Sequence, residues 1–446
     1  MRVQLRTDRA QQARAGALLL DAYDPVPGHD PASTVQIHAI ADRSPGRPRV
    51  AIPPAASEFL WFAIAACLAD VVVRRADAPD GWTRSIELSV PLSNGRWTAA
   101  ALAHAAAMLG FLTGDRWSID VTAGGPSRAL TIPVPVGDAV CLLSGGLDSL
   151  VGSIDLLADG RRTVLVGAQD SGVSANRQRL LGQRLADAYQ GQVDAHRVGA
   201  RPRRPGAQQA VPLQLVRENT TRSRSLLFVA WAMAYAAALG PDTEVYLPEN
   251  GMIGINVPVS PSRVGSLSTR TTHPHFIGML RELLSGTGIT NPLSNPYRLM
   301  TKGQAMQHCA HPGLLRDLAP MTLSCAHPLA RRYQRRTGSP RGCGYCYPCL
   351  VRRAAMHTVG LDDPRGYDLD VLANAEFLGS ESNTRASLQA VVAALHRPPS
   401  RLAVLRNGPV PLAEIGAFAA VHQEGIAELG RWLGTATAQH LIQALR

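Results

Sequence analysis

At about 150 residues per domain, this chain of 446 residues is long enough for two or three domains. Hydrophobic residues make up 46% of it, so it can bury a substantial core and is not disordered as a whole. Aromatic residues make up only 5%, which argues against a stacking surface for single-stranded nucleic acid, and the formal net charge of +11 suits a polyanionic partner without identifying one.

No apolar run reaches the roughly 18 uncharged residues of a membrane span. The basic N-terminus is not followed by the apolar segment of a secretory signal. We therefore expect a cytoplasmic protein with no membrane contact.

Residues 1–136 are predicted to form an N-terminal α/β accessory domain. Their apolar patterning predicts two helices, the first of them buried, over 57–73 and 97–112. It also predicts three strands, the last two joined as a hairpin around a Gly-Gly-Pro turn, over 85–90, 117–121 and 129–136. We find no catalytic group of residues in this segment.

In residues 137–361, predicted strands alternate with predicted helices. The strands are expected over 139–143, 163–167, 193–198 and 244–247, and the clearest helices over 177–189 and 222–239. This alternation predicts an α/β fold with a doubly wound parallel sheet. A long polar loop is expected over 249–272, and residues 362–446 are expected to form a helical C-terminal region.

A glycine-rich turn, Ser144-Gly145-Gly146-Leu147-Asp148-Ser149, follows the first of these strands and opens a helix. Its glycines let backbone amides approach a phosphate closely, and the start of a helix attracts anions. Ser144 and Ser149 can donate hydroxyl hydrogen bonds, and Asp148 offers the oxygen ligands that Mg²⁺ prefers. The turn is not a Walker A loop, because no Gly-Lys-Ser/Thr follows it.

Lys302 is the only lysine among the 45 basic residues, in the sequence MTKGQAM at the expected start of a helix. Arginine serves equally well as a surface charge, whereas a compact ammonium directed at a phosphate is one role in which the two are not interchangeable. We therefore regard Lys302 as a candidate phosphate ligand.

Four of the seven cysteines follow the spacing C-x17-C-x2-C-x2-C: Cys325, Cys343, Cys346 and Cys349. Four thiolates complete a tetrahedral zinc site, which leaves no open position for chemistry and predicts a structural metal. An iron–sulfur cluster and the alternative ligands His327 and His357 are the competing interpretations. Buried, unligated thiols are expected at the other three positions: Cys67, Cys141 and Cys309.

The turn at 144–149 resembles the SGGxDS signature of the PP-loop ATP pyrophosphatases. Together with TK at 301–302, TLSC at 322–325 and CGYCYPCLVR at 343–352, it resembles the QueC, or 7-cyano-7-deazaguanine synthase, family. The resemblance covers about residues 138–360 and implies a PP-loop fold of the adenine nucleotide α-hydrolase type.

The same resemblance implies a ligase that cleaves ATP between its α- and β-phosphates. Such an enzyme adenylates 7-carboxy-7-deazaguanine, after which ammonia forms an amide that is dehydrated to a nitrile. The turn from Ser144 to Ser149 would grip the pyrophosphate, Asp148 would hold Mg²⁺, and Lys302 would neutralise phosphate charge. Gln169, at the end of the second strand, would lie near the adenosine.

The chain has long additional segments before and after the QueC-like part, and an arginine-rich insertion between the first two zinc cysteines. These additions resemble the QueC-like proteins of anti-phage gene clusters, called QatC in the Qat system. That resemblance implies a defence role, and a partner protein of the same gene cluster could supply the attacking amine in place of ammonia. QueC relatives also suggest a homodimer.

Five residues in or just after the long loop are candidate substrate ligands. Glu249 and Asn250 offer hydrogen bonds suited to a guanine-like edge, whereas Arg270, His273 and His275 could orient the carboxylate or the amine. Ordering of the loop is the alternative role for all five.

Two other functions compete with the ligase. A tRNA-modifying PP-loop enzyme would use the arginine runs at 201–204 and 331–341 to hold RNA phosphates. A non-catalytic module would bind ATP or a deazaguanine and recruit partners, although the complete turn, Asp148 and Lys302 argue against it.

Overall fold

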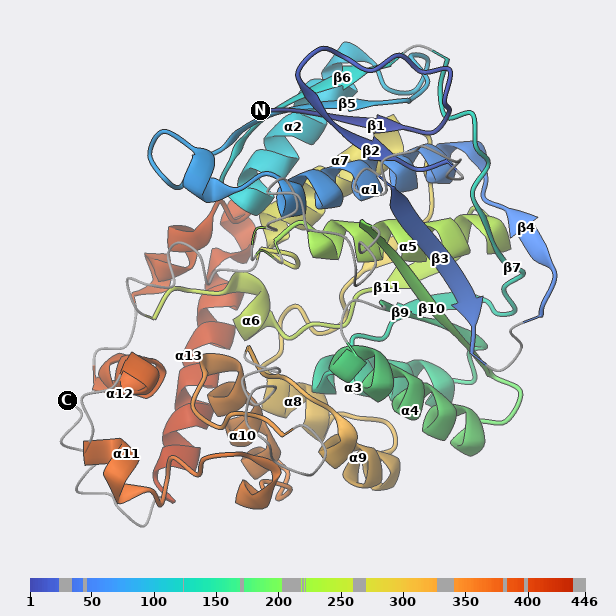
Figure 1. The fold of residues 1–446 in the computed structure, drawn as a ribbon. Helices are drawn as coiled ribbons and strands as arrows, with labels where there is room; N and C mark the ends of the chain where they lie inside the picture. The colour runs from blue at the N-terminus through green and yellow to red at the C-terminus, as the bar shows by residue number, and fades with distance from the viewer. Residues whose placement is uncertain are drawn as a thin grey trace, which may run out of the picture.

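The computed structural model describes residues 1–23, 34–42, 46–122, 124–168, 172–202, 218, 220, 222–259, 270–326, 341–379, 383–396 and 400–435. Within them the chain forms an α/β structure with two main sheets (Figure 1). From top to bottom in that view lie a four-stranded sheet, a layer of helices, a six-stranded sheet and a second layer of helices.

The six-stranded sheet has the order β12-β11-β8-β9-β10-β3. Its strands are β3 (Val35–Ala41), β8 (Ala139–Leu142), β9 (Thr163–Ala168), β10 (Val193–Pro202), β11 (Glu244–Tyr246) and β12 (Leu293–Ser294). All neighbours are parallel except β3, which runs antiparallel to β10 at the edge. The four strands predicted from the sequence are thus confirmed, and their parallel arrangement with them.

Helices cover both faces of this sheet. Helices α3 (Leu147–Ala158) and α4 (Gly172–Ala188) lie on one face, and α5 (Arg224–Leu239) lies on the other (Figure 1). Because β8 and β9 are covered on both sides, their residues are buried without alternation, as expected for parallel strands.

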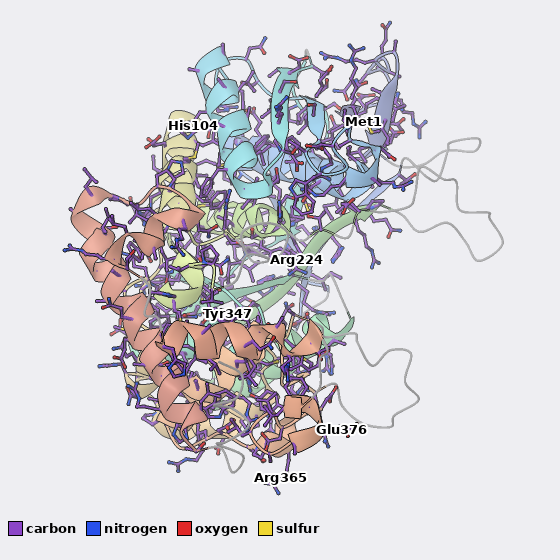
Figure 2. The ribbon with its side chains drawn as sticks, turned by 90° about the vertical axis from the view of Figure 1, so that its left-hand side faces the viewer. Met1, His104, Arg224, Tyr347, Arg365 and Glu376 are labelled. Atoms are coloured by element: carbon purple, nitrogen blue, oxygen red, sulfur yellow. The ribbon has the colours of Figure 1, made fainter. Side chains whose placement is uncertain are left out.

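The four-stranded sheet is entirely parallel, in the order β2-β1-β5-β6. Its strands are β1 (Arg2–Arg6), β2 (Ala17–Asp21), β5 (Ser85–Val90) and β6 (Arg116–Val121). Helix α2 (Ala99–Thr113) packs against β6 and against α7 (Pro274–Gly286), where His104 Nε2 lies 2.7 Å from Met279 O (Figure 2).

The predicted hairpin of 117–121 with 129–136 is wrong. β6 pairs in parallel with β5, and β7 (Thr131–Pro133) pairs instead with β4 (Arg49–Ala51) in a separate two-stranded antiparallel sheet. Alternating hydrophobicity indicates that one face of a strand is buried, but it does not identify the strand with which it pairs.

Helix α1 (Pro54–Val72) is long and apolar enough to cross a membrane by length and composition, but 89% of its most apolar window is buried inside the protein. It lies between the four-stranded sheet and α5 (Figure 1). A helix that is apolar on all sides is explained by such a position in a core. Its side chains share one hydrophobic cluster with those of α5, so residues 1–136 pack directly on the segment that follows them.

The remaining α-helices of the described residues all follow β11 in the chain, whereas the 3₁₀ helices begin with η1, just after α1. The α-helices are α6 (Gly251–Ile255), α8 (Lys302–Gln307), α9 (Pro312–Leu318), α10 (Tyr347–Thr358), α11 (Ala375–Gly379), α12 (Ala386–His396) and α13 (Ile415–Leu433). The 3₁₀ helices are η1 (Arg75–Asp77), η4 (Ala319–Met321), η5 (Pro364–Gly366), η6 (Asn383–Arg385), η7 (Arg401–Asn407) and η8 (Leu412–Glu414). Helix α13 contacts α6, α10, α12 and η7, so the C-terminal region is built into the fold.

A buried ion network joins the N-terminal sheet to α5. Arg84, whose side chain is 1% exposed, lies 2.5 Å from both Asp70 and Asp115. Arg75 pairs with Asp115 at 2.9 Å, and Ser223 Oγ, just before α5, donates to Asp70 at 2.6 Å. Every charge in this network therefore has an opposite charge beside it, as burial requires.

Replacing Asp115 with alanine should destabilise the protein by about 3–5 kcal/mol, because Arg75 and Arg84 would lose a buried counter-charge. Urea unfolding followed by circular dichroism measures this change. The matched control is Arg14→Ala, which removes an exposed pair with Asp120 and should leave the unfolding midpoint unchanged. Equal midpoints for the Asp115 variant and the wild type would contradict the role assigned to the network.

Candidate active site and metal centre

The order of the strands in the six-stranded sheet reverses at β8. The chain passes from β8 to β9 and β10 on one side, and then returns to β11 and β12 on the other. In open α/β sheets, ligands bind outside the carboxyl ends of the strands where the order reverses in this way. Here the two strands at that point are followed by the segments 144–149 and 249–250.

The segment 144–149 forms a tight turn into α3. Gly145 has a φ of +86°, which favours glycine, and α3 begins at Leu147. The Ser144 hydroxyl donates to Ser149 Oγ at 3.0 Å, and the Ser149 hydroxyl donates to Gly146 O at 3.0 Å. The predicted strand–turn–helix context of the sequence is therefore present.

The structure brings Lys302 to this turn. Lys302 Nζ lies 2.5 Å from Asp148 Oδ2, although the two residues are 154 positions apart in the chain. Both residues are only 6% exposed. Thr301 caps the start of α8 and forms a capping box with Gln304, which fixes the backbone from which Lys302 extends.

Glu249 and Asn250 join the same cluster from the end of β11. Asn250 Nδ2 donates to Asp148 Oδ2 at 2.9 Å and to Glu249 Oε1 at 3.1 Å, while its Oδ1 accepts from Ile253 N and caps α6. Asn250 is fully buried, so in this structure its amide is used within the protein and is not offered to a substrate edge.

The surroundings shift the pKa values of the two carboxyl groups of this cluster, Asp148 and Glu249, in opposite directions. Burial tends to raise the pKa of Asp148, but the charge of Lys302 and hydrogen bonds from Glu249, Lys302 and Asn250 lower it below its usual value. Burial, followed by the charge of Asp148, raises the pKa of Glu249 well above its usual value. A proton in this pair is therefore favoured on Glu249, and the negative charge is favoured on Asp148.

Glu428 of α13 is a part of this site that the sequence analysis missed. Its carboxylate accepts from the hydroxyl of Thr301 and from the backbone of Gly303, on both sides of Lys302. A Cβ at Gly303 would lie only 2.4 Å from Glu428 Oε1, so the approach requires glycine. No local pattern could reveal this contact, because Glu428 is 127 residues from Thr301.

A polar cavity of about 460 Å³ lies beside Glu428, between α8, α10 and α13. Its lining consists of polar and charged side chains: Gln304, Gln307, His357, Thr358, Glu424, Glu428 and Arg431.

The three remaining substrate candidates form a separate cluster at the start of α7. Arg270 Nη1 donates to Phe111 O at 2.7 Å, and the His275 ring lies edge-on to Phe111 at 4.8 Å. His273 caps α7 and is fully buried, and burial together with the Arg270 charge lowers its pKa to about 3. Within the described ranges, no hydrogen bond or ion pair links these three residues to the turn at 144–149.

Some predicted positions lie outside the described residues. These are Gln169, His327, most of the arginine run at 331–341, and the middle of the long loop. The described start of that loop differs from the prediction, because 251–255 forms helix α6 under the cap of Asn250.

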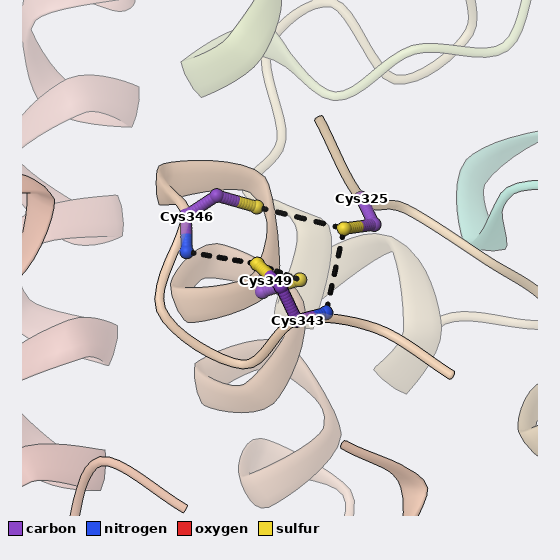
Figure 3. A group of neighbouring side chains, drawn as sticks. All are labelled: Cys325, Cys343, Cys346 and Cys349. Atoms are coloured by element: carbon purple, nitrogen blue, oxygen red, sulfur yellow. Dashed lines mark hydrogen bonds between the residues drawn. The ribbon is translucent and has the colours of Figure 1, made fainter. Parts of the chain in front are cut away.

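The four predicted cysteines come together at the start of α10 (Figure 3). Their sulfur atoms all lie within 4.8 Å of one another, with 3.9 Å between Cys343 and Cys349 and 4.0 Å between Cys325 and Cys346. Sulfur atoms around a tetrahedral zinc ion lie about 3.8 Å apart, so the cluster could hold such a metal.

The backbone around this cluster is shaped for close approach. Gly344 has a φ of +89°, and a Cβ there would lie 2.0 Å from Leu369 O. Hydrogen bonds from the other three thiols lower the pKa of Cys325, so a thiolate is favoured there. His357 lines the cavity beside α13 and is not part of the sulfur cluster.

The other cysteines have the character of buried thiols. Burial raises the pKa of Cys141 to about 12 and that of Cys309 to about 12, and Cys67 is 6% exposed. Such thiols are poor nucleophiles near neutral pH.

Comparisons with protein-family models, with curated proteins and with solved structures give no match for this chain.

Replacing Glu249 with glutamine should weaken the pH dependence of stability. The raised pKa of Glu249 means that the unfolded chain loses this proton first, so the wild type loses stability as pH rises above about 4.5. Glutamine keeps an N–H donor and has no proton to lose. Urea unfolding between pH 4.5 and 8 tests this, with the exposed Glu282→Gln as control. An unchanged pH slope in Glu249→Gln would contradict the assigned protonation.

Replacing Cys343 with alanine should reduce bound metal to well below the level of about one zinc ion per chain expected for the wild type. The variant should also unfold at a lower temperature, because the metal cross-links the ends of two segments. Elemental analysis and calorimetry measure the two effects, and Cys309→Ala, outside the cluster, is the control. Wild-type protein purified without a stoichiometric metal would rule out the site.

Proposed function

We propose that this protein is an ATP-dependent carbon–nitrogen ligase of the PP-loop type. It activates a carboxylate as an acyl-adenylate, releases pyrophosphate and transfers the acyl group to a nitrogen nucleophile. The observation that carries this proposal is the contact of Lys302 Nζ with Asp148 at the turn 144–149. The glycine-rich turn and Lys302 each suggested phosphate binding independently in the sequence, and in the structure they are in contact.

Each part of the turn has a role in this reaction. The amides of Gly145 and Gly146 and the hydroxyls of Ser144 and Ser149 would hold the pyrophosphate, beside the start of α3. Lys302 would neutralise the phosphate charge that develops on the leaving group. Leu147 belongs to the turn through its backbone, since its side chain is fully buried.

Asp148 and Glu249 are the residues that would hold Mg²⁺, because both are carboxyl groups and they face each other at the carboxyl ends of β8 and β11. When bound, this ion would supply Lewis acidity at the phosphates. Glu249 would have to release its proton to solvent before its carboxylate could ligate the ion, because carboxylate ligands bind metals in their deprotonated form. The four-cysteine cluster would hold zinc in a structural role.

The carboxylate that we propose is that of 7-carboxy-7-deazaguanine, and this choice depends on the QueC-like order of motifs. An acyl-adenylate has a good leaving group, so any positioned amine can attack it. The sequence has no glutaminase-like segment, and we propose free ammonia or an amine of a partner protein as the nucleophile. The setting we propose is cytoplasmic anti-phage defence.

A tRNA-modifying enzyme is the second candidate, favoured by the net charge of +11. The thiols argue against the thiolating members of that class. Four cysteines form the metal cluster, and burial raises the pKa of Cys141, the cysteine nearest to the turn in sequence, to about 12.

Lys302→Met and Asp148→Asn should each lower AMP formation from ATP by about 100-fold or more, because each removes one of the charges that the reaction uses. Chromatography of reactions with ATP, Mg²⁺ and 7-carboxy-7-deazaguanine measures this. Each single variant leaves the other charged side chain buried without its partner, and this alone can destabilise the protein. The double variant Lys302→Met, Asp148→Asn removes both charges, so it tests whether the protein folds without the ion pair.

Arg47→Gln is the matched control, since it breaks the ion pair of Arg47 with Asp194 away from the turn and should keep its activity. Wild-type rates of AMP formation in either Lys302→Met or Asp148→Asn would overturn the proposed function.

A further inference from the structure

A segment between η4 and the metal cluster lies against the turn. Leu323 N donates to Gly145 O at 3.0 Å, and Ser324 Oγ lies 3.4 Å from the position that a Cβ at Gly146 would occupy. Cys349 Sγ approaches Ser324 O at 3.8 Å, which connects this segment to the metal cluster. The glycine turn therefore has a second wall, provided by residues 321–324.

Two arginines flank this wall. Arg177 of α4 packs its Cβ 3.4 Å from the position of a Cβ at Gly145, and its Nη1 donates to Met321 O at 3.0 Å. Arg352 of α10 donates to Thr322 Oγ1 at 2.5 Å and to Ala319 O at 2.9 Å. Both guanidinium groups thus hold the same short segment.

Arg177 and Arg352 place two further positive charges beside the turn. Lys302 is already neutralised by Asp148, so on its own the turn has no surplus positive charge for a polyanion. Arg352 is 6% exposed, and within the described part of the chain all its hydrogen bonds are to neutral oxygen atoms. Burial and the charge of Arg352 lower the pKa of Arg177, so the two cations repel each other beside the turn.

We propose that Arg177 and Ser324 form the second half of the anion site, so that pyrophosphate is held between the glycine turn and the wall 321–324. This inference rests on the proposed function and adds two ligands to it. Arg177 lies beside Gly145, and its planar fork suits two phosphate oxygens. Ser324 would donate its hydroxyl beside Gly146. Arg352 acts as a positioning residue, because it fixes the wall and does not need to contact the ligand.

The test is calorimetric titration of the full-length protein with inorganic pyrophosphate. Arg177→Gln should weaken binding about tenfold or more, since it removes a charge-assisted contact. Arg177→Lys should recover only part of the loss, because a point charge replaces a fork. The matched control is Arg179→Gln, an exposed arginine on the same helix whose hydrogen bonds within the described residues are to Gln183 and Asn176, and it should bind as the wild type does.

Ser324→Ala gives an independent reading if the Arg177 variants do not fold, with an expected weakening of about threefold. Wild-type affinity in both Arg177→Gln and Ser324→Ala, with tight binding by the wild type, would overturn this inference and leave the proposed function intact. An absence of pyrophosphate binding in the wild type, together with no AMP formation, would overturn both.

Discussion

The ion pair between Asp148 and Lys302 is the interaction on which the site depends. Two buried charges this close stabilise a fold only when each remains compensated, so the pair fixes the start of α3 against the start of α8. The capping box of Thr301 and the carboxylate of Glu428 hold the lysine side of the pair. Because Glu428 belongs to α13, this C-terminal helix also contributes to the site.

Much of the site could be predicted because its signals are local. A buried strand followed by Ser-Gly-Gly and a helix predicts a phosphate-binding turn from backbone geometry alone, and the structure has that strand, turn and helix at Ala139–Ala158. The spacing of the cysteines predicted their grouping, because ligands two residues apart reach one ion from a single knuckle. The parallel sheet followed from alternation of strands and helices.

Other features depend on contacts between distant segments, which no local pattern records. The hairpin prediction was wrong because the partner of a strand is chosen by the whole sheet, and β6 pairs with β5. Glu249 and Asn250 remain predicted substrate ligands, and no local pattern predicted the contact with Asp148 that the structure shows across the switch in strand order. Glu428 approaches Lys302 from a segment with no recognisable motif.

The most direct measurement is mass spectrometry of the protein with ATP, Mg²⁺ and 7-carboxy-7-deazaguanine, with and without ammonium. We expect AMP and pyrophosphate together with a modified carboxylate. Free nitrile would indicate the full synthase reaction, and an adenylate or amide that goes no further would direct attention to a partner amine. Unchanged ATP and unchanged carboxylate under both conditions would contradict the account.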